Sequence, residues 1–570
     1  MKRIRSYFKG HLLSSLPGPL FKLLEAALEL AMPLLVMAIV DRDIPYGAAS
    51  RIFLMALALA ALGLAGLMCS VAARHFTEKS STELAARLRR SMFRCAQGFS
   101  CDDIDRLGAP ALAASLTDDV DRVREVARQF LTLSLHAPLL LFGTAWMSLR
   151  INAHSAPIFT AAVLMLMPIV LGISLRATSL RCRAREQEAS LTLRVRENLS
   201  GVRVLRGFCR EDAEIDAFNR NSAQLARTQH TADRISVLKN PLTLTVTILS
   251  LIALLAANTG QLTQGGAAAL AICLGLSLAE LCRLSDFIAT LGRTAESLRR
   301  VDSILKLRPS LRSPARPAAL DPRAIGQVDF VNVRLRLPGS NADLLTGLNF
   351  SIRRGQIVGI IGGTASGKST LAGLIPRLRD ASSGTVRVNG ADVRAQPLRA
   401  LRARISFVPQ HPALFQGSIR DNLRWADPTA DDGALMEAVH AAQAEDILRD
   451  MGGLDGRLEP FGTNLSESQR CLFAIARALV RRPDILILDG STSSLDPTTD
   501  TQLRLALRQL SYRPTVFITS QRVSAVRHAD RILVLDEGKL VGDGTHEQLL
   551  SHCQIYREIC DSQARKEAAA

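Results

Sequence analysis

The sequence predicts a multi-domain protein in which an all-α transmembrane bundle of six helices is followed by an α/β domain. Two features of composition support this prediction. The chain has 570 residues, which is too long for one ordinary domain. Apolar residues make up 48% of it and charged residues still make up 22%, a mixture that fits a membrane part joined to a water-soluble part. The third observation is that long apolar runs occupy the first half, whereas the second half carries short buried strands and a glycine-rich loop. This composition excludes a disordered chain, a collagen and a disulfide scaffold.

Six apolar segments make up the predicted bundle, and most approach the roughly 20 residues that a helix needs to cross the hydrocarbon core. They span about 18–40, 52–74, 130–149, 155–175, 241–258 and 267–288. The segment at 241–258 is short and rich in Thr, so it is the weakest of the six. An even number of spans places both ends of this half on the same side of the membrane.

The basic residues predict which side that is. Two long connections, 75–129 and 176–240, hold 22 Lys and Arg residues, whereas the three short connections hold 3. Because cytoplasmic loops carry the excess of Lys and Arg, we expect the long connections and both termini in the cytoplasm. The long connections are low in Gly and Pro, so we expect cytoplasmic helical hairpins. Their candidate contact regions for a soluble domain are Ala109–Val120 and Ser200–Phe208.

The formal net charge of +17 is unevenly distributed. Residues 1–325 hold 40 basic and 26 acidic side chains, and residues 326–570 hold 30 and 27. A nucleic-acid-binding protein can be this basic, but the excess lies in the half with the apolar runs. We therefore expect membrane lipid and no nucleic acid as a partner, and a multi-pass protein of the plasma (inner) membrane. The ten cysteines show no CxxC spacing, which favours reduced thiols over a metal cluster or disulfides.

A few ionisable residues lie inside the predicted spans, where a charge is a functional hypothesis by default. They are Glu25, Glu29, His136, Glu280, Arg283 and Asp286. Glu25 and Glu29 are four residues apart and share a helix face, and Glu280 can pair with Arg283 within one helix. These residues either clasp helices together or line a polar path for a substrate.

A segment rich in Pro, Ser and Arg, 306–325, predicts a linker. The expected domains are therefore a transmembrane domain at 1–305 and a second domain at 326–570.

The second domain is expected to bind a nucleotide, because it contains a glycine-rich loop. A buried strand ending at Ile361 leads into a sequence that matches GxxxxGK[ST] and then into a helix. Its residues are Gly362, Gly363, Thr364, Ala365, Ser366, Gly367, Lys368, Ser369 and Thr370. Such a loop wraps backbone N–H groups around phosphates.

The side chains of this loop predict how a nucleotide is held. Lys368 supplies charge to the outer phosphates, and the Ser369 hydroxyl can bind Mg²⁺. A second buried strand, Asp484 to Leu488, ends in Asp489, and an Asp at that position can hold Mg²⁺ through its water shell.

Further segments follow in an order that resembles the ATP-binding cassette (ABC) exporters. They are Val408–Gln410, Asn464–Arg470, Ile485–Asp489, Ser493–Asp496 and Thr519–Arg522, which look like the Q-loop, the signature, Walker B, the D-loop and the switch region. The resemblance covers nearly the whole chain and implies a six-helix membrane domain fused to a P-loop NTPase domain. It also implies ATP and Mg²⁺ as cofactors, with Gln410 and Leu337 as further ATP contacts and Ser369, Gln410 and Asp489 around the metal.

The departures from the family pattern concern the chemistry of hydrolysis. The family has Glu after the Walker B Asp, and this chain has Gly490. The family's switch His is Gln521, and the aromatic residue that stacks on adenine is Leu337. A positioned general base is worth about 10²–10⁴ in rate, so we expect no intact catalytic residue and weak or absent hydrolysis at this chain's own site.

The signature is altered as well. The family pattern LSGGQ is replaced by Leu-Ser-Glu-Ser-Gln, in which Ser466, Glu467, Ser468 and Gln469 are expected to face the partner's ATP. Glu467 brings a negative charge towards the γ-phosphate and should weaken binding unless a cation offsets it.

The resemblance implies an ABC-type transporter ATPase that works with a second half-transporter, since each ATP lies between two nucleotide-binding domains. A homodimer would have two damaged sites, so a heterodimer is favoured. The altered signature does not fit the usual pattern of such heterodimers, in which the degenerate subunit supplies an intact signature. We expect the degenerate half of an exporter of small or amphipathic molecules. The alternatives are a nonhydrolytic scaffold or regulatory pseudo-transporter, and an exporter-fold importer of metal-chelate complexes.

Overall fold

The computed structural model describes residues 16–45, 49–154, 156–257, 262–314, 327–336 and 342–569. The described chain divides into two units. Unit 1 is all-α and comprises Met1–Gly98 and Leu107–Arg308, and unit 2 is α/β and comprises Phe99–Arg106 and Pro309–Ala570. The predicted fold class is confirmed. The bounds 305 and 326 of the predicted domains stay a prediction, and most of the expected linker lies outside the described residues.

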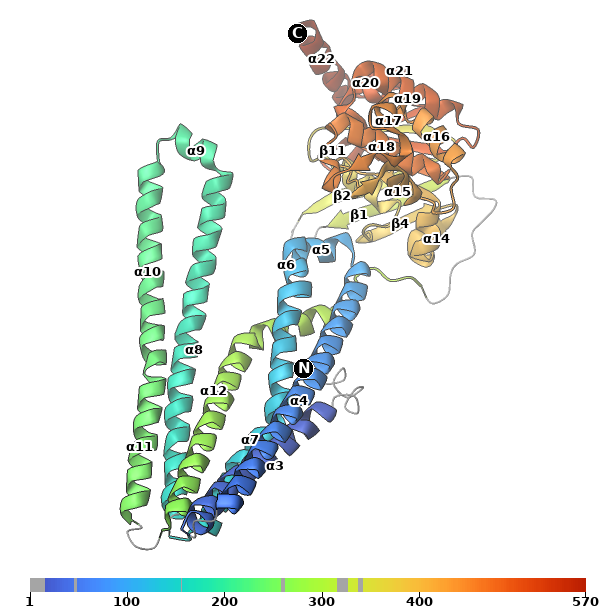
Figure 1. The fold of residues 1–570 in the computed structure, drawn as a ribbon. Coiled ribbons are helices and arrows are strands. Elements are labelled where there is room, and N and C mark those ends of the chain that lie inside the picture. The colour runs from blue at the N-terminus through green and yellow to red at the C-terminus, as the bar shows by residue number, and fades with distance from the viewer. Residues whose placement is uncertain are drawn as a thin grey trace. The chain divides into compact units, whose positions relative to one another are not determined.

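Unit 1 consists of long helices joined by short turns (Figure 1). They are α3 (Pro17–Ala38), α4 (Ala49–Gln97), α6 (Ala109–Ala114), α7 (Val120–Ile151), α8 (Ala156–Ser200), α9 (Val202–Gly207), α10 (Glu211–Val237), α11 (Lys239–Ala257) and α12 (Gln264–Lys306). Helix α3 begins with Pro17 in its first turn, where a missing N–H costs nothing. Helices α3, α7 and α12 pack against one another, and the charged residues of the spans meet between them.

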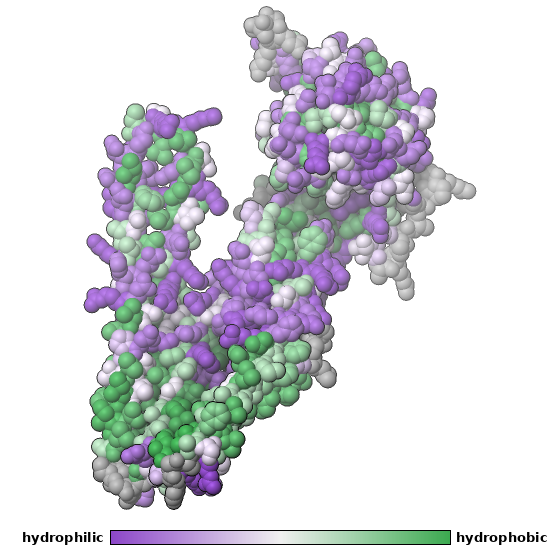
Figure 2. Space-filling view, viewed as in Figure 1, coloured by the Kyte–Doolittle hydropathy of each residue, from purple (hydrophilic) through white to green (hydrophobic). Residues whose placement is uncertain are grey.

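Within the part of the chain that the structure describes, six helical segments are long and apolar enough to cross a membrane. They are Pro17–Asp43, Ala49–Gln97, Ala109–Ile151, Ala156–Ser200, Glu211–Ala256 and Gln264–Lys306. Large apolar side chains point outward from them: Phe53 is 72% exposed, Phe142 77% and Trp146 62%. Figure 2 shows these apolar surfaces as a continuous band on unit 1, with charged surface along the helices beyond it. Such a band is what lipid would cover.

Both long connections are helical over most of their length, as their low Gly and Pro content predicts. Helices α8 and α10 run side by side and the short α9 joins them (Figure 1). Arg194 on α8 holds Glu214 on α10, with Nε and Oε2 3.0 Å apart. The expected contact region Ser200–Phe208 covers α9, where the Phe208 side chain is 75% exposed.

A short part of the first connection belongs to the α/β unit. Helix α5 (Cys101–Leu107) carries three carboxylates, and Phe99–Arg106 belongs to unit 2. Asp102 lies 2.7 Å from Arg379 Nε, and Asp103 accepts hydrogen bonds from Ser310. The expected region Ala109–Val120 lies in unit 1 instead. A contact of Ala109–Val120 with a soluble domain therefore stays a prediction.

The α/β unit is built on a six-stranded sheet with the order β12-β11-β3-β10-β9-β6. Its strands are β3 (Ile357–Ile361), β6 (Ile405–Val408), β9 (Ile485–Asp489), β10 (Thr515–Ser520), β11 (Arg531–Asp536) and β12 (Lys539–Gly544). All pairs are parallel except the edge pair of β11 and β12. Strands β9 and β10 are buried along their whole length, as expected for parallel strands covered on both faces.

A second, antiparallel sheet has the order β2-β1-β4-β5. It consists of β1 (Val328–Arg336), β2 (Asp343–Ile352), β4 (Ser383–Val388) and β5 (Ala391–Asp392), and a short pair joins β7 (Gly417–Ser418) to β8 (Arg457–Leu458). The helices of this unit are α13 (Lys368–Leu374), α14 (Leu398–Ala403), α15 (Ile419–Arg424), α16 (Asp432–Ala441), α17 (Glu445–Asp450), α18 (Glu467–Val480), α19 (Pro497–Gln509), α20 (Val523–Val526), α21 (His546–His552) and α22 (Gln554–Ala569).

Candidate functional site

A glycine-rich loop joins β3, near the middle of the six-stranded sheet, to α13. Two of its glycines are required by the backbone. A Cβ at Gly362 would lie 2.1 Å from the Leu535 carbonyl oxygen, and Gly367 has a φ of +96°, which favours glycine. A Cβ at Gly363 would meet nothing within 4 Å, so the loop is open on that side. The loop therefore forms a narrow backbone turn with room for a ligand above it.

The Lys368 ammonium is folded into this loop. Its Nζ donates to the carbonyl oxygens of Gly362 at 3.0 Å and Gly363 at 2.6 Å, and to the Ser366 hydroxyl at 3.2 Å. Burial lowers the pKa of the Lys368 ammonium, and the negative charge of Asp489 acts against that shift. A half-buried ammonium held only by neutral oxygens is suited to receive an anion.

Asp489 ends β9 and faces the same loop. The Ser369 hydroxyl donates to Asp489 Oδ1 at 2.8 Å, and the Thr519 hydroxyl donates to the same oxygen at 2.7 Å. Strand β10 lies between β3 and β9 in the sheet, so the carboxyl ends of these parallel strands bring the three residues together. A carboxylate and a hydroxyl are oxygen ligands of the kind that Mg²⁺ prefers, so the residues fit that ion.

These residues border a cavity of 690 Å³, a size within the usual range for small-molecule sites. It is lined by Leu344, Thr364, Ala365, Ser366, Gly367, Lys368, Ser369, Thr370, Gln410, Gly490, Ser493, Thr519, Ser520, Gln521 and Arg522. Most of the predicted ATP contacts are among them. Gly362, Gly363 and Asp489 lie directly beside the cavity through the contacts above. Leu337 lies outside the described residues.

Two of the positions that depart from the family pattern, Gly490 and Gln521, lie on this cavity. Gly490 has a φ of +60°, and its N–H donates to the Thr519 carbonyl at 3.1 Å and to the Thr519 hydroxyl at 2.8 Å. A Cβ at Gly490 would lie 3.3 Å from Gln410 Cγ. Gln521 is exposed, and its carbonyl accepts a hydrogen bond from Gln563. Among the described residues that line the cavity, none is Glu, Asp or His.

Some lining residues were missed by the sequence analysis. Leu344 comes from β2 and carries no local motif. Ser493, Thr519 and Arg522 lie in segments that the resemblance identified, but no role was assigned to them. Thr519 is the most informative of these, because its hydroxyl touches Asp489 and its backbone and hydroxyl both hold Gly490. Its position at the end of a buried strand was the signal that could have identified it.

The signature residues lie apart from this cavity, at the start of α18. Ser466 caps that helix: its hydroxyl accepts from the Gln469 N–H at 3.2 Å, and the Gln469 side chain accepts from the Ser466 N–H at 3.0 Å. The Ser466 and Ser468 hydroxyls are 3.0 Å apart. Glu467 lies 3.4 Å from the His411 ring, so protonation of His411 would place a cation beside the unexpected carboxylate. Ser466 and Gln469 together form the capping box at the N-terminus of α18.

Comparisons with known proteins agree with this geometry. The profile of the ABC transporter family matches residues 345–493, and that of the ABC transporter transmembrane region matches residues 17–271. The solved structure of a bacterial Atm1-family ABC exporter with ATP bound covers 98% of this chain and of its own with a TM-score of 0.82 at 22% identity. That likeness shows the fold.

Relatives that align with nearly the whole chain indicate the same family. An uncharacterized ABC transporter ATP-binding protein of Mycobacterium tuberculosis is 31% identical over 96% of this chain and 95% of its own length. An uncharacterized ABC transporter ATP-binding protein of Bacillus subtilis is 28% identical over the whole of both chains. An ATP-dependent lipid A-core flippase of Bordetella pertussis is 28% identical over 99% of this chain and 91% of its own. The chain belongs to the ABC transporter family, as an exporter-type half-transporter whose membrane domain is fused to an ATP-binding domain.

Proposed function

We propose that this chain is the catalytically degenerate half of a heterodimeric, ATP-driven exporter of small or amphipathic molecules in the plasma (inner) membrane. Transporters of this family work as dimers, and the cytoplasmic domain binds ATP. The observation that carries the proposal is the cavity beside Lys368 and Asp489. It keeps the groups that hold phosphate and a metal ion. Apart from the Asp489 carboxylate, which Ser369 and Thr519 hold, the described residues around it include no carboxylate or imidazole that can accept a proton from water.

In this proposal each side chain of the cavity has a limited task. The loop N–H groups and Lys368 hold the phosphates, while Ser369, Gln410 and Asp489 surround Mg²⁺, which neutralises phosphate charge when bound. Thr519 fixes the Asp489 carboxylate by its hydrogen bond at 2.7 Å. Gly490 contributes no group that can orient or deprotonate water, and Gln521 donates a hydrogen bond without becoming cationic. ATP is therefore held and turned over slowly at this site.

Hydrolysis is then performed at the second site. There a partner supplies the glycine-rich loop, the Glu after the Walker B Asp and the switch His. This chain contributes Ser466, Glu467, Ser468 and Gln469 to that site. The Ser466 hydroxyl, 3.0 Å from that of Ser468, is the group here that can donate to a γ-phosphate. Closure of the two domains on ATP is passed to the membrane helices through contacts such as that of Asp102 with Arg379.

The cargo class follows from the membrane domain. Its spans bury a few charged side chains among apolar walls, which suits molecules with both apolar and polar parts. One relative is an ATP-dependent lipid A-core flippase, and an amphipathic lipid belongs to the same chemical class.

The test is co-purification with each ABC half-transporter encoded in the same genome, with the affinity tag on this chain. We expect one equimolar complex that hydrolyses ATP and transports substrate, and we expect a Glu→Gln change after the partner's Walker B Asp to abolish both activities. If no combination releases phosphate faster than this chain alone, the chain is a nonhydrolytic scaffold and the proposal fails.

A further inference from the structure

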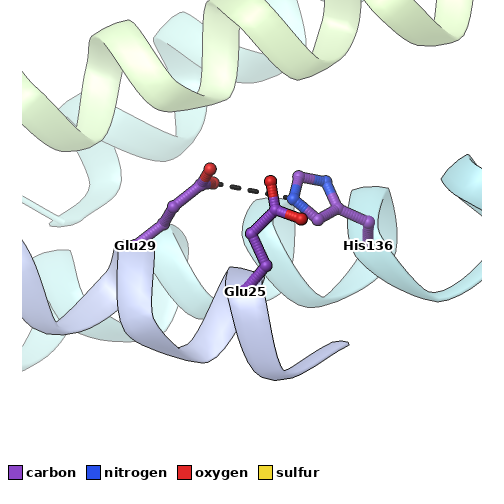
Figure 3. Close-up of side chains that lie close together, drawn as sticks. All are labelled: Glu25, Glu29 and His136. Carbon is purple, nitrogen blue, oxygen red and sulfur yellow. Dashed lines mark ion pairs between the residues drawn. The ribbon is translucent and has the colours of Figure 1, made fainter. Parts of the chain in front are cut away.

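Three side chains from two membrane helices converge between those helices. Glu25 and Glu29 lie one turn apart on α3, and His136 lies on α7 (Figure 3). One ligand atom of each, a carboxylate oxygen or a ring nitrogen, lies within 4.8 Å of the others. Glu25 is 7% exposed and His136 is 1% exposed. Two carboxylates and an imidazole at such distances are a donor set for a metal ion.

The orientation of the His136 ring is fixed from the opposite side. Its Nδ1 lies 2.6 Å from Glu280 Oε1 on α12, and that same oxygen accepts a hydrogen bond from Arg283 at 2.9 Å. A carboxylate held by a guanidinium is an acceptor, so His136 Nδ1 carries the proton and donates it. In the neutral ring the lone pair is then on the other nitrogen, Nε2, which is the ring atom that faces Glu29. Metal-binding histidines are oriented by carboxylates in the same way.

The His136 Nε2 atom has no hydrogen-bond partner although it is buried. Glu29 Oε2 lies 3.6 Å from it, which is too long for a hydrogen bond. In that form the Nε2 lone pair and the Glu29 carboxylate are two neighbouring acceptors with no donor between them, and a buried polar atom of this kind is costly. A cation placed between the three groups would satisfy all of them.

The charges around the cluster also leave room for a cation. Lys22 holds Glu25, with Nζ 2.7 Å from Oε2, and Arg283 holds Glu280. Glu29 makes a direct ion pair with neither Lys22 nor Arg283. A cavity of 400 Å³ reaches the cluster and is lined by Glu25 and His136, and also by Arg74, Glu78 and Arg128. Arg128 in turn lies 3.5 Å from Glu78.

We propose that Glu25, Glu29 and His136 bind a divalent transition-metal ion in the membrane domain. One imidazole nitrogen and two carboxylate oxygens suit Zn²⁺, Co²⁺ or Mn²⁺ better than Mg²⁺ or Ca²⁺, which prefer oxygen alone. Three protein ligands leave a coordination position open towards the cavity. Glu280 is a positioning residue that sets the tautomer of His136. The ion takes one Glu25 oxygen from Lys22 when it binds. This site requires neither ATP nor a partner chain, so it stands apart from the proposed function.

The test uses the full-length chain without a histidine tag, in lipid nanodiscs, stripped with EDTA and with its ten cysteines blocked. Zn²⁺ binding is measured by calorimetry and Co²⁺ binding by its visible ligand-field absorption. We expect one ion per chain and a Co²⁺ spectrum that reports nitrogen and oxygen ligands. Glu280→Gln should weaken binding by about 10- to 100-fold, the usual effect of losing such an orienting carboxylate. Glu29→Gln and His136→Gln should weaken it by more.

Two control variants separate this site from adventitious binding. Glu78→Gln removes a carboxylate that lines the same cavity outside the cluster, and His154→Gln removes an exposed histidine of the same unit. Both should bind Zn²⁺ as the unmodified chain does. Should His136→Gln fail to fold, Glu29→Gln carries the test, because the Glu29 side chain is 26% exposed and its replacement is nearly isosteric. Absence of Zn²⁺ binding by the unmodified chain, or equal binding by Glu29→Gln and Glu78→Gln, would overturn the proposal.

Discussion

The two sides of the nucleotide cavity differ in how much of their chemistry they keep. On the phosphate side, Lys368 is held by three oxygens of its own loop, and Ser369 is bonded to Asp489. On the water side, Gly490 and Gln521 occupy the positions from which a base and a cation act in related proteins. In the proposed function, the first side therefore binds ATP, whereas the second lacks a group that activates water. Binding and hydrolysis would then be lost separately, although Asp489 on the first side and Gly490 on the second are adjacent at the end of β9.

The largest expected effect comes from breaking the phosphate side. Lys368→Ala removes the only charged side chain of the glycine-rich loop. Hydrogen bonds to charged groups contribute about 1.5–3 kcal/mol, so we expect Mg-ATP binding to weaken by about 10- to 100-fold. Equilibrium binding of a fluorescent ATP analogue to the isolated chain measures this. Lys539→Ala, an exposed lysine in β12 of the same unit, should leave binding unchanged.

A second variant tests the signature, which lies apart from both sides of this cavity. Ser466→Ala should lower hydrolysis at the partner's site on the order of tenfold, less than the roughly 10²–10³ lost with an ideally aimed donor, because both signature glycines are already replaced. Glu467→Gly should act the opposite way, because it removes a carboxylate from the place where phosphate charge develops. Phosphate release by the co-purified heterodimer is the measurement.

Loss of the helix cap needs its own control, since a missing N-cap costs about 1 kcal/mol by itself. Ser418→Ala removes the same kind of capping box from α15 and should leave the partner's hydrolysis unaffected. If Ser466→Ala and Ser418→Ala behave alike, the signature of this chain serves no working site.

A third variant tests how nucleotide binding reaches the membrane helices. Arg379→Ala removes the ion pair with Asp102. Both side chains of this pair are partly exposed. Pairs of this kind contribute about 0.2–1 kcal/mol, so we expect transport per ATP to fall by about 2- to 5-fold while ATP binding stays the same. Arg387→Ala, on the exposed side of β4, is the matched control. The charge-reversed pair Asp102→Arg with Arg379→Asp should recover coupling, and a failure to recover it would remove this contact from the coupling path.

The smallest expected effect is the recovery from Gly490→Glu alone. The φ of +60° at Gly490 is unfavourable for any other residue by about 1–2 kcal/mol, and Gln521 and Leu337 remain in place. We expect far less than the 10²–10⁴-fold gain of a positioned base. Gly490→Ala separates the backbone strain from the carboxylate, since both variants should lower thermal stability alike. Adding Gln521→His and Leu337→Tyr should exceed the sum of the single changes, because such groups act as a unit.

Sequence reasoning identified the features that are local in the chain. The loop Gly362–Thr370 follows its strand directly, and the six apolar segments need no tertiary information. Lys368, Ser369 and Asp489 were assigned to one ATP and Mg²⁺ site because the loop motif and an Asp at a strand end are both local patterns. The fold class and the family followed from these patterns.

Features that depend on the packing of distant segments could not be predicted in the same way. The bonds of Thr519 to Asp489 and Gly490 arise because β10 lies beside β9. The left-handed backbone of Gly490 depends on its turn, and Leu344 enters the cavity from another sheet. The sequence placed Glu25 and Glu29 on one helix face but gave no indication that His136 and Glu280 meet beside them.

The central claim is that this chain binds ATP and does not hydrolyse it at its own site. The most direct test is a single experiment on the isolated, purified chain in saturating Mg-ATP, with bound nucleotide and released phosphate followed in the same sample. We predict near-stoichiometric ATP that remains intact over many minutes, and loss of that ATP in Lys368→Ala. Steady phosphate release by the isolated chain that disappears in Lys368→Ala would contradict the account, because it would show that Gly490 and Gln521 do not disable the site.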